Sequence, residues 1–328
     1  MNASIDEARI HLWGIVDDLS RLEPTPRLRV ALLSYGNSRN PRESGWIRIN
    51  RPLTDDLDAV SRSLFELRTG GSEEYVERVV RVALDQLEWS EEDQAVRMIF
   101  VMGNEEADQD QAIDPEDLAL DAGRREIAVH PIYVGGGGGR NYQTWRSLSE
   151  TLGVQVATLR PGKRPEGPAS PFDRELASSG QELSATYVPY GENGAEAAEN
   201  QILQDQNVES LGVSVAASRA ITKAGPLYQG DWDLVDAVDS GRVFLEDVPE
   251  EDLPAIMQAM TPAERDDYLF RLADRRRELK DRIRSLGEQR ERHIESSRAA
   301  GVKATGDDLR RLVRRTVRER AEAQGFEF

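Results

Sequence analysis

The sequence predicts an α/β fold: a doubly wound, mostly parallel sheet flanked by helices, followed by an all-α extension. Two short apolar runs, 96–102 and 127–134, have the character of strands buried on both faces, which is typical of parallel sheets covered by helices. Segments with helical spacing of apolar residues separate the predicted strands, and this alternation is the pattern of a doubly wound, Rossmann-like sheet. After residue 171 the patterns are helical, so the extension is expected there.

The first 170 residues alternate between helical and strand patterns. The chain opens on a helix, because Ser4 to Glu7 form a capping box and apolar residues then recur at helical spacing as far as Leu19. Pro24 and Pro26 end that helix. The further elements expected in this region are strands at 28–33, 46–49, 96–102, 127–134 and 154–159, and helices at 57–67, 76–87, 118–125 and 142–152.

Helices are expected throughout the remainder, at 172–183, 195–219, within 249–260 and from 261 to 297. Thr261 and Glu264 form a capping box at the start of the last of these. A second arm around 309–317 is expected to fold back as its antiparallel partner after the polar break 301–306, because each apolar stripe is too narrow to stand alone in water. We therefore predict an N-terminally incomplete α/β domain at 1–170, a helical connector region at 171–260 and a C-terminal helical hairpin at 261–328.

Composition excludes several classes of function. The net charge of −18 argues against nucleic acid as the main partner. The lack of cysteine excludes disulfides, thiol catalysis and Cys–zinc sites. No stretch approaches the roughly 18 apolar residues of a membrane span, and the polar, amphipathic N-terminus is not a signal peptide. The compartment stays open, and an extracytoplasmic location would require a true N-terminus upstream of Met1.

Polar and acidic residues follow the predicted strands at their carboxyl ends, which is where open α/β sheets place their ligands. We therefore expect the loops 34–40, 70–74 and 103–110 to converge at one sheet edge and to bind a protein partner. The Gly70-Gly71 pair at the start of the second of these loops by itself indicates only the entry into a helix. The partner-binding residues that we predict are Ser34, Tyr35, Asn37, Ser72, Glu73, Glu74, Asn104 and Glu105.

Three segments together, LRVALLSYG, TDDLDAVSRSLFELRTGGSEEYVERVVRVAL and MIFVMGNEE, resemble a von Willebrand factor A-type domain over roughly residues 1–160. The closest resemblance is to bacterial proteins of unassigned function that carry such a domain. This resemblance implies a metal ion-dependent adhesion site, in which a DxSxS loop after the first strand, a threonine and an aspartate hold a metal ion. Oxygen ligands of this kind suit Mg²⁺ or Mn²⁺.

The sequence departs from that family pattern. The first strand and its DxSxS loop are absent, and Gly103-Asn104 stands where the family has Thr-Asp. Only Ser72, Asn104 and Glu105 remain as candidate metal ligands, so Mg²⁺ or Mn²⁺ is expected only if a DxSxS loop exists upstream. In the family the first strand lies between the strands that correspond to 28–33 and 96–102. We therefore expect the chain to be a truncation of a longer protein, or those two strands to pair directly.

The favoured function is a non-enzymatic protein-binding or scaffold module with a degenerate or incomplete adhesion site. One alternative is a nucleotide- or phosphate-binding enzyme that uses the glycines from Gly135 to Gly139, although Arg140 falls on the third glycine of a G-x-G-x-x-G pattern. The other is a structural protein that forms oligomers through its C-terminal helices. The sequence predicts no catalytic residue.

Overall fold

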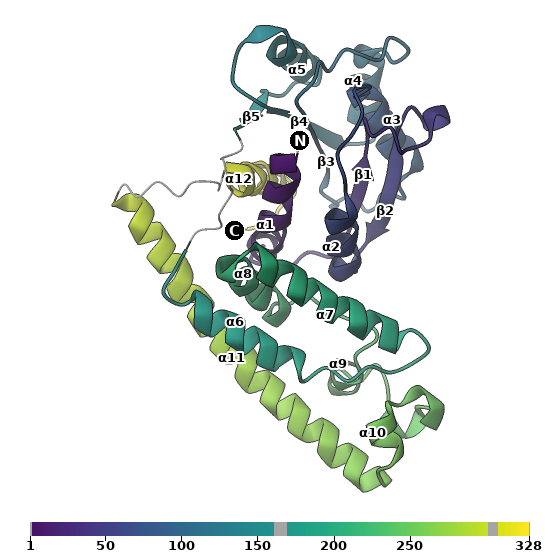
Figure 1. Cartoon of the computed structure of the whole chain (residues 1–328), viewed down its shortest axis with the longest axis vertical. Coiled ribbons are helices and arrows are strands. Elements are labelled where there is room, and N and C mark those ends of the chain that lie inside the picture. The colour runs from purple at the N-terminus through teal and green to yellow at the C-terminus, as the bar shows by residue number, and fades with distance from the viewer. Residues whose placement is uncertain (1, 161–168, 301–307, 328) are drawn as a thin grey trace. The chain divides into compact units, whose positions relative to one another are not determined.

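The structure is a computed structural model, and it describes residues 2–160, 169–300 and 308–327 (Figure 1). The chain divides into two compact units. The first consists of Met1–Arg9, Leu22–Pro165 and Thr305–Phe328, and the second consists of Ile10–Arg21 and Glu166–Ala304. Helix α1 (Asn2–Leu19) begins in the first unit and ends in the second. None of the helices in the described ranges is both long enough and apolar enough to cross a membrane.

The first unit confirms the predicted α/β class, but its described strands form two small sheets. Strands β3 (Arg97–Gly103), β4 (Ile127–Val134) and β5 (Ala157–Leu159) form a parallel sheet in the order β3-β4-β5. Strands β1 (Val30–Ser34) and β2 (Arg48–Thr54) form an antiparallel pair. Direct pairing of the strands at 28–33 and 96–102, one of our two expectations, is therefore wrong for the residues described.

The strands of the first unit are more buried where both of their edges are paired. Strand β4 is hydrogen-bonded along both edges and is almost entirely buried. Strands β1 and β3 are similarly apolar, but each pairs along one edge within the described chain, and their residues are mostly half-buried. An apolar strand needs neighbours as well as covering helices to become a core strand, and the sequence pattern reports only the apolar character.

The core of the first unit lies between the β3-β4-β5 sheet and the helices α3 (Val76–Gln86), α4 (Pro115–Arg124) and α5 (Gly139–Thr151). Asp56 is the N-cap of helix α2 (Leu57–Glu66), because its carboxylate accepts the N–H of Ala59 at 2.9 Å. The buried residues of this core are Ile47, Val76, Val79, Val80, Leu84, Val101, Ala107, Leu118, Ala122, Ile127, Val129, Tyr133, Trp145 and Leu148.

The second unit is helical, as predicted for this part of the chain. The expected helix at 195–219 is instead two helices, because Gly212, at φ 134°, separates them. The predicted capping box is confirmed: the carboxylate of Glu264 accepts the N–H of Thr261 at 2.8 Å. The helices are α6 (Asp173–Ser184), α7 (Gly194–Leu211), α8 (Val213–Ala224), α9 (Leu234–Asp239), α10 (Ala255–Gln258) and α11 (Pro262–Ala299).

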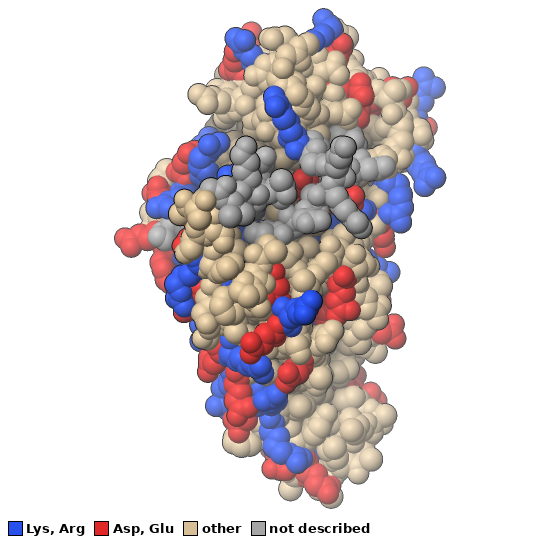
Figure 2. Space-filling model, turned by 60° about the vertical axis from the view of Figure 1, so that its left-hand side comes forward, with Lys and Arg blue, Asp and Glu red and all other residues tan. Residues whose placement is uncertain are grey.

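Helix α11 carries many charges, and several are balanced locally. Arg277 pairs with Asp274, and Arg284 pairs with Asp281 at 2.9 Å, each one turn apart. Figure 2 shows Lys and Arg interspersed with Asp and Glu over the helical part of the face it presents. Exposed pairs of this kind contribute little to stability, so this surface is a solvated one with charges of both signs.

The two ends of the chain build the first unit together. Helix α12 (Asp308–Ala323) contacts β5, and the backbones of Glu23 and Glu327 exchange two hydrogen bonds of 2.8 Å. The helical unit is therefore an insertion, in sequence, between β5 and α12. Helices α11 and α12, the arms of the predicted hairpin, belong to different units. The break at 301–306 lies outside the described residues, and the antiparallel hairpin stays a prediction.

Candidate functional site

The loops 34–40, 70–74 and 103–110 lie together at the carboxyl ends of β1 and β3. The N–H of Ser38 donates to the carbonyl of Gly70 at 2.9 Å, which joins the first loop to the second. The N–H of Glu74 donates to Oε1 of Gln109 at 3.1 Å, which joins the second loop to the third. The hydroxyl of Tyr35 donates to the carbonyl of Met102 at 2.6 Å. The predicted convergence of the loops is therefore present in the first unit.

The glycine turn before α3 is part of this contact. Gly71 has φ 119°, and a Cβ built on it would lie 2.2 Å from the carbonyl oxygen of Gly36. Only glycine allows the two backbones to come so close. Gly36, at φ 72°, lies in turn against the side chain of Glu74. Our expectation that the glycine pair marks only a helix entry is thus wrong, because its second glycine also fixes the first loop against the second.

Several of the predicted partner-binding residues hold the loops in shape. Asn37 donates its side-chain amide to the carbonyl of Arg68 at 2.6 Å. Ser34 is half-buried and accepts a 3.4 Å hydrogen bond from Asn40. The carbonyl of Asn104 accepts from Asn141, on α5, at 3.0 Å. These contacts make the loops a fixed surface, and they occupy groups that we had assigned to a partner.

Other predicted residues present their side chains outward. Ser72 is exposed, and its hydroxyl lies 3.3 Å from the carboxylate of its neighbour Glu73. Glu105 is also exposed, and its Oε1 accepts from the amide of Asn104 at 3.0 Å. Within the described ranges, no group of three or more His, Asp or Glu side chains is placed to hold a metal ion. The metal set Ser72, Asn104 and Glu105 stays a prediction.

Two carboxylates lie behind this surface, and the sequence analysis identified only the first of them. Glu74 has a raised pKa because it is buried and lies near Glu105, although the backbone N–H groups of Glu105 and Asn104 bond to it and oppose the rise. Glu77, on the first turn of α3, is 2% exposed, and burial together with two nearby aspartates raises its pKa to about 7. Burial and both glutamates raise the pKa of Tyr35 well above its ordinary value.

A third acid near this pair, Asp110, is bonded to an arginine. Asp110 receives two hydrogen bonds from Arg78, with Nη2 at 2.7 Å from Oδ1. Burial alone would raise the pKa of Asp110, but these hydrogen bonds hold it below its usual value. At the rim, the exposed Arg140 pairs with Glu106 at 2.8 Å and with Asp108 at 3.3 Å. Arg78 and Arg140 are therefore engaged with acids other than Glu74 and Glu77.

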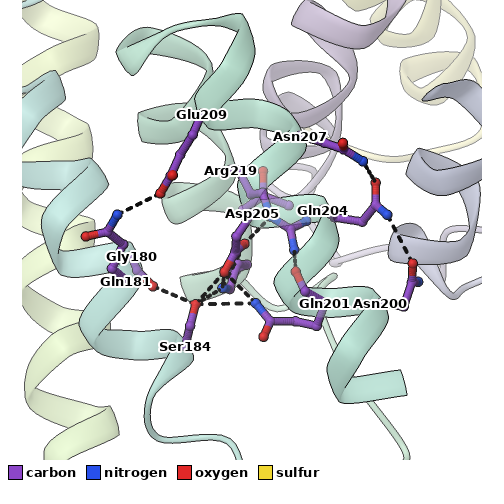
Figure 3. A network of polar contacts seen from close by, with 12 residues as sticks. Gly180, Gln181, Ser184, Asn200, Gln201, Gln204, Asp205, Asn207, Glu209 and Arg219 are labelled. Atoms are coloured by element: carbon purple, nitrogen blue, oxygen red, sulfur yellow. Dashed lines mark hydrogen bonds and ion pairs between the residues drawn. The ribbon is translucent and has the colours of Figure 1, made fainter. Parts of the chain in front are cut away.

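A second cluster of charged groups lies inside the helical unit (Figure 3). Asp205, on α7, accepts from the hydroxyl of Ser184 at 2.6 Å, from Gln201 at 2.7 Å and from Lys223 at 3.0 Å, and it is also bonded to Arg219. Arg219 and Lys223 are each 1% exposed. Burial opposes ionisation of Asp205, but the two cations hold its pKa at about 2.

This cluster contains a contact between Lys223 and Ser184, the two residue types of a Ser-Lys nucleophile pair. A lysine that acts as a base must be neutral, and here the ammonium lies between the hydroxyl and the ionised Asp205. The hydroxyl of Ser184 donates its proton to Asp205 and not to Lys223. The cluster is best described as a structural ion-pair network that joins α6, α7 and α8.

Two further buried pairs join helices of the second unit. Arg276, on α11, is bonded to Asp233 and lies 2.6 Å from Asp236. Arg290 lies 2.7 Å from Asp173. The sequence analysis did not anticipate these pairs, although both arginines fall on the apolar seam of α11, where a charged residue signals a buried partner.

The comparisons with known proteins identify no family. No family model matches the chain, and no curated protein matches it. The chain is similar to the crystal structure of the conserved hypothetical protein BatB from Bacteroides thetaiotaomicron, with 12% identity and a TM-score of 0.35 over 48% of this chain and 80% of that one. It is also similar to proximal thread matrix protein 1 from the mussel byssus, with 11% identity and a TM-score of 0.33 over 58% of each chain. TM-scores of this size are too low to define a shared fold.

Proposed function

We propose that this chain is a non-enzymatic protein-binding module of the von Willebrand factor A type, with a degenerate adhesion site. The observation that carries the proposal is the hydrogen-bonded convergence of the loops 34–40, 70–74 and 103–110. Loops that are already fixed lose little conformational freedom when a partner binds, and binding residues are commonly placed on such loops of a rigid scaffold. The family assignment itself is supported by the three sequence segments that resemble it.

The exposed side chains of the site suit a protein surface better than a small molecule. Ser72 and Glu105 are exposed, and Glu73 and Asn104 are half-buried beside them. A small-molecule site is usually a concave and mostly apolar pocket. A cavity of about 340 Å³ is lined instead by residues of β3, β4, α4 and α12, such as Arg97, Ile127 and Arg320, together with neighbouring loops. The proposed site is therefore a surface for another protein.

The phosphate-binding alternative has less support. A phosphate cradle needs backbone N–H groups that are held around the anion. The glycines 136–139 are exposed, and a Cβ built at any of them would meet nothing within 4 Å. This loop therefore shows no packing that would fix its N–H groups in place.

Affinity capture tests the proposal. The site variant combines Glu73→Ala, Asn104→Ala and Glu105→Ala, and the control variant combines Glu91→Ala and Asp93→Ala, two exposed acids in the loop before β3. Both proteins are first checked for native circular dichroism and are then used as bait in lysate of the source cells. We expect the wild type and the control to enrich the same partner by at least tenfold over the site variant. Equal enrichment by all three proteins would contradict the site assignment.

A further inference from the structure

Three buried acceptor atoms at the strand ends lack a hydrogen-bond donor among the residues described. They are Oε2 of Glu74, Oε2 of Glu77 and Oδ1 of Asn104. The hydroxyl of Tyr35 lies near both glutamates, but it donates to the carbonyl of Met102. A buried acceptor without a donor is costly, and buried polar groups in native proteins are nearly always bonded. Because these atoms lie near one another and each is closed to solvent, a group with several donors would satisfy them if it entered between the loops.

The charges around these atoms indicate the sign of such a group. Glu105 lies near Glu74, and Asp108 and Asp110 lie near Glu77. Arg78, which pairs with Asp110, and Arg140, which pairs with Glu106, are bonded to other acids of the same loops. Among the described residues, negative charges therefore prevail around these atoms, and the group that they would accept should be a cation.

We propose that these acceptors receive the ammonium group of a lysine side chain from the protein partner. An ammonium has three donors and no acceptor, so it matches the oxygens of Glu74, Glu77 and Asn104 in number and in charge. A divalent metal fits less well, since the described residues offer no group of three or more acidic or histidine side chains placed to hold one. Glu73 and Glu105, at the surface, would attract a basic segment toward the site. This inference rests on the proposed function, because it names the group that the same loops recognise.

The test is an NMR titration of the full chain with a short lysine peptide, acetylated at its N-terminus and amidated at its C-terminus. The matched peptide carries norleucine, which has a similar apolar stem and no ammonium. A concentration of about 10 mM covers millimolar dissociation constants, as expected for one side chain. We expect saturable amide shifts at residues 72–77 and 103–107 with the lysine peptide only. Equal shifts with norleucine, shifts elsewhere only, or no saturation would overturn the proposal.

Two variants and a metal control complete the experiment. Glu74→Gln with Glu77→Gln keeps the shape of both side chains and removes their charge, so the lysine response should weaken at least tenfold while the spectrum stays dispersed. The control Glu91→Gln with Asp93→Asn should respond like the wild type. If Mg²⁺ alone shifts the same amides at concentrations where the lysine peptide has no effect, the site binds a metal ion and the ammonium proposal is wrong. Loss of partner capture in the site variant, without a lysine response, would refute this inference and leave the proposed function standing.

Discussion

The buried or half-buried aspartates of the helical unit differ in their partners from two glutamates at the strand ends of the α/β unit. In the helical unit Asp173, Asp205 and Asp233 are each bonded to a buried arginine, and the pKa of Asp205 is held at about 2. At the strand ends of the α/β unit, Glu74 and Glu77 each keep one carboxylate oxygen without a donor among the described residues, and the pKa of Glu77 rises to about 7. The arginine–aspartate pairs of the helical unit are Arg219–Asp205, Arg276–Asp233 and Arg290–Asp173.

This difference separates structural acids from candidate binding acids. A buried carboxylate beside an arginine stays ionised, and its removal leaves the cation uncompensated, so such a pair is bound to the fold. Ionisation of a buried carboxylate without a cation beside it is unfavourable. Such a carboxylate can therefore bind a proton or a positively charged group. The comparison therefore supports the proposal that Glu74 and Glu77 bind a partner, whereas the three aspartates of the helical unit are parts of structural ion pairs.

The largest effect is expected at Arg276. Asp233 is fully buried, so Arg276→Met leaves its charge without a partner, and we expect a loss of about 3–5 kcal/mol in the free energy of unfolding. The matched control is Arg277→Met, which removes an exposed pair with Asp274 and should cost less than about 1 kcal/mol. Urea denaturation followed by tryptophan fluorescence measures both. Equal losses would show that the buried pair is not structural.

Glu77→Gln should have the opposite sign. The folded-state pKa of about 7 lies above the ordinary value of 4.5, so the contribution of Glu77 to stability is fully present below pH 4.5 and is lost as the pH rises through 7. At pH 8 the variant should be more stable than the wild type by up to ~3 kcal/mol. Thermal or urea unfolding between pH 4.5 and 8 checks this, and a variant that is less stable than the wild type at pH 8 would contradict it.

Asp205 should show the reverse pH dependence. Its pKa is lowered from 3.8 to about 2, so its contribution is present above pH 3.8 and is lost as the pH falls through 2. We expect about 2 kcal/mol of the acid sensitivity of the helical unit to come from this residue. Comparison of wild type and Asp205→Asn in urea at pH 4 and pH 2 measures it. An equal change in the free energy of unfolding between pH 4 and pH 2 in both proteins would show that Asp205 does not contribute to the acid sensitivity.

The smallest effect is expected in the loops. Gly71→Ala places a Cβ against the carbonyl of Gly36 at φ 119°, so it should cost about 1 kcal/mol or more and shift the amide resonances of residues 34–40. Gly137→Ala is the matched control, because nothing lies within 4 Å of the added atom. Unchanged resonances in the first loop of Gly71→Ala would show that the loops are not held together by this contact.

The strands, most helices and the convergence of the loops could be predicted, because they depend on local patterns and on one rule about strand ends. The division into two sheets could not, since the apolar runs of β1 and β3 do not reveal which edges are paired. The insertion of the helical unit between β5 and α12 could not be predicted either. An apolar stripe on a helix shows that one of its faces is buried, but it does not show which element packs against that face.

The burial of two of these charged residues could have been predicted from their positions in the sequence. Glu77 lies three residues before Val80 and seven before Leu84, on the apolar face of α3. Arg276 lies three residues before Leu279 and seven before Ile283, on the apolar seam of α11. A charged residue at such a position predicts a buried charge. Its partner, or the lack of one, depends on contacts across the fold and is not encoded in the spacing.

The most direct measurement of the central claim is an NMR titration of the side-chain carboxyl carbons in the free, full-length protein. The resonance of Glu77 is assigned by its absence from Glu77→Gln. We expect a midpoint near pH 7, because this carboxylate is buried beside Asp108 and Asp110. A midpoint near the ordinary value of 4.5 would show that Glu77 is solvated or already paired, and it would remove the difference between the two units on which the proposed binding chemistry depends.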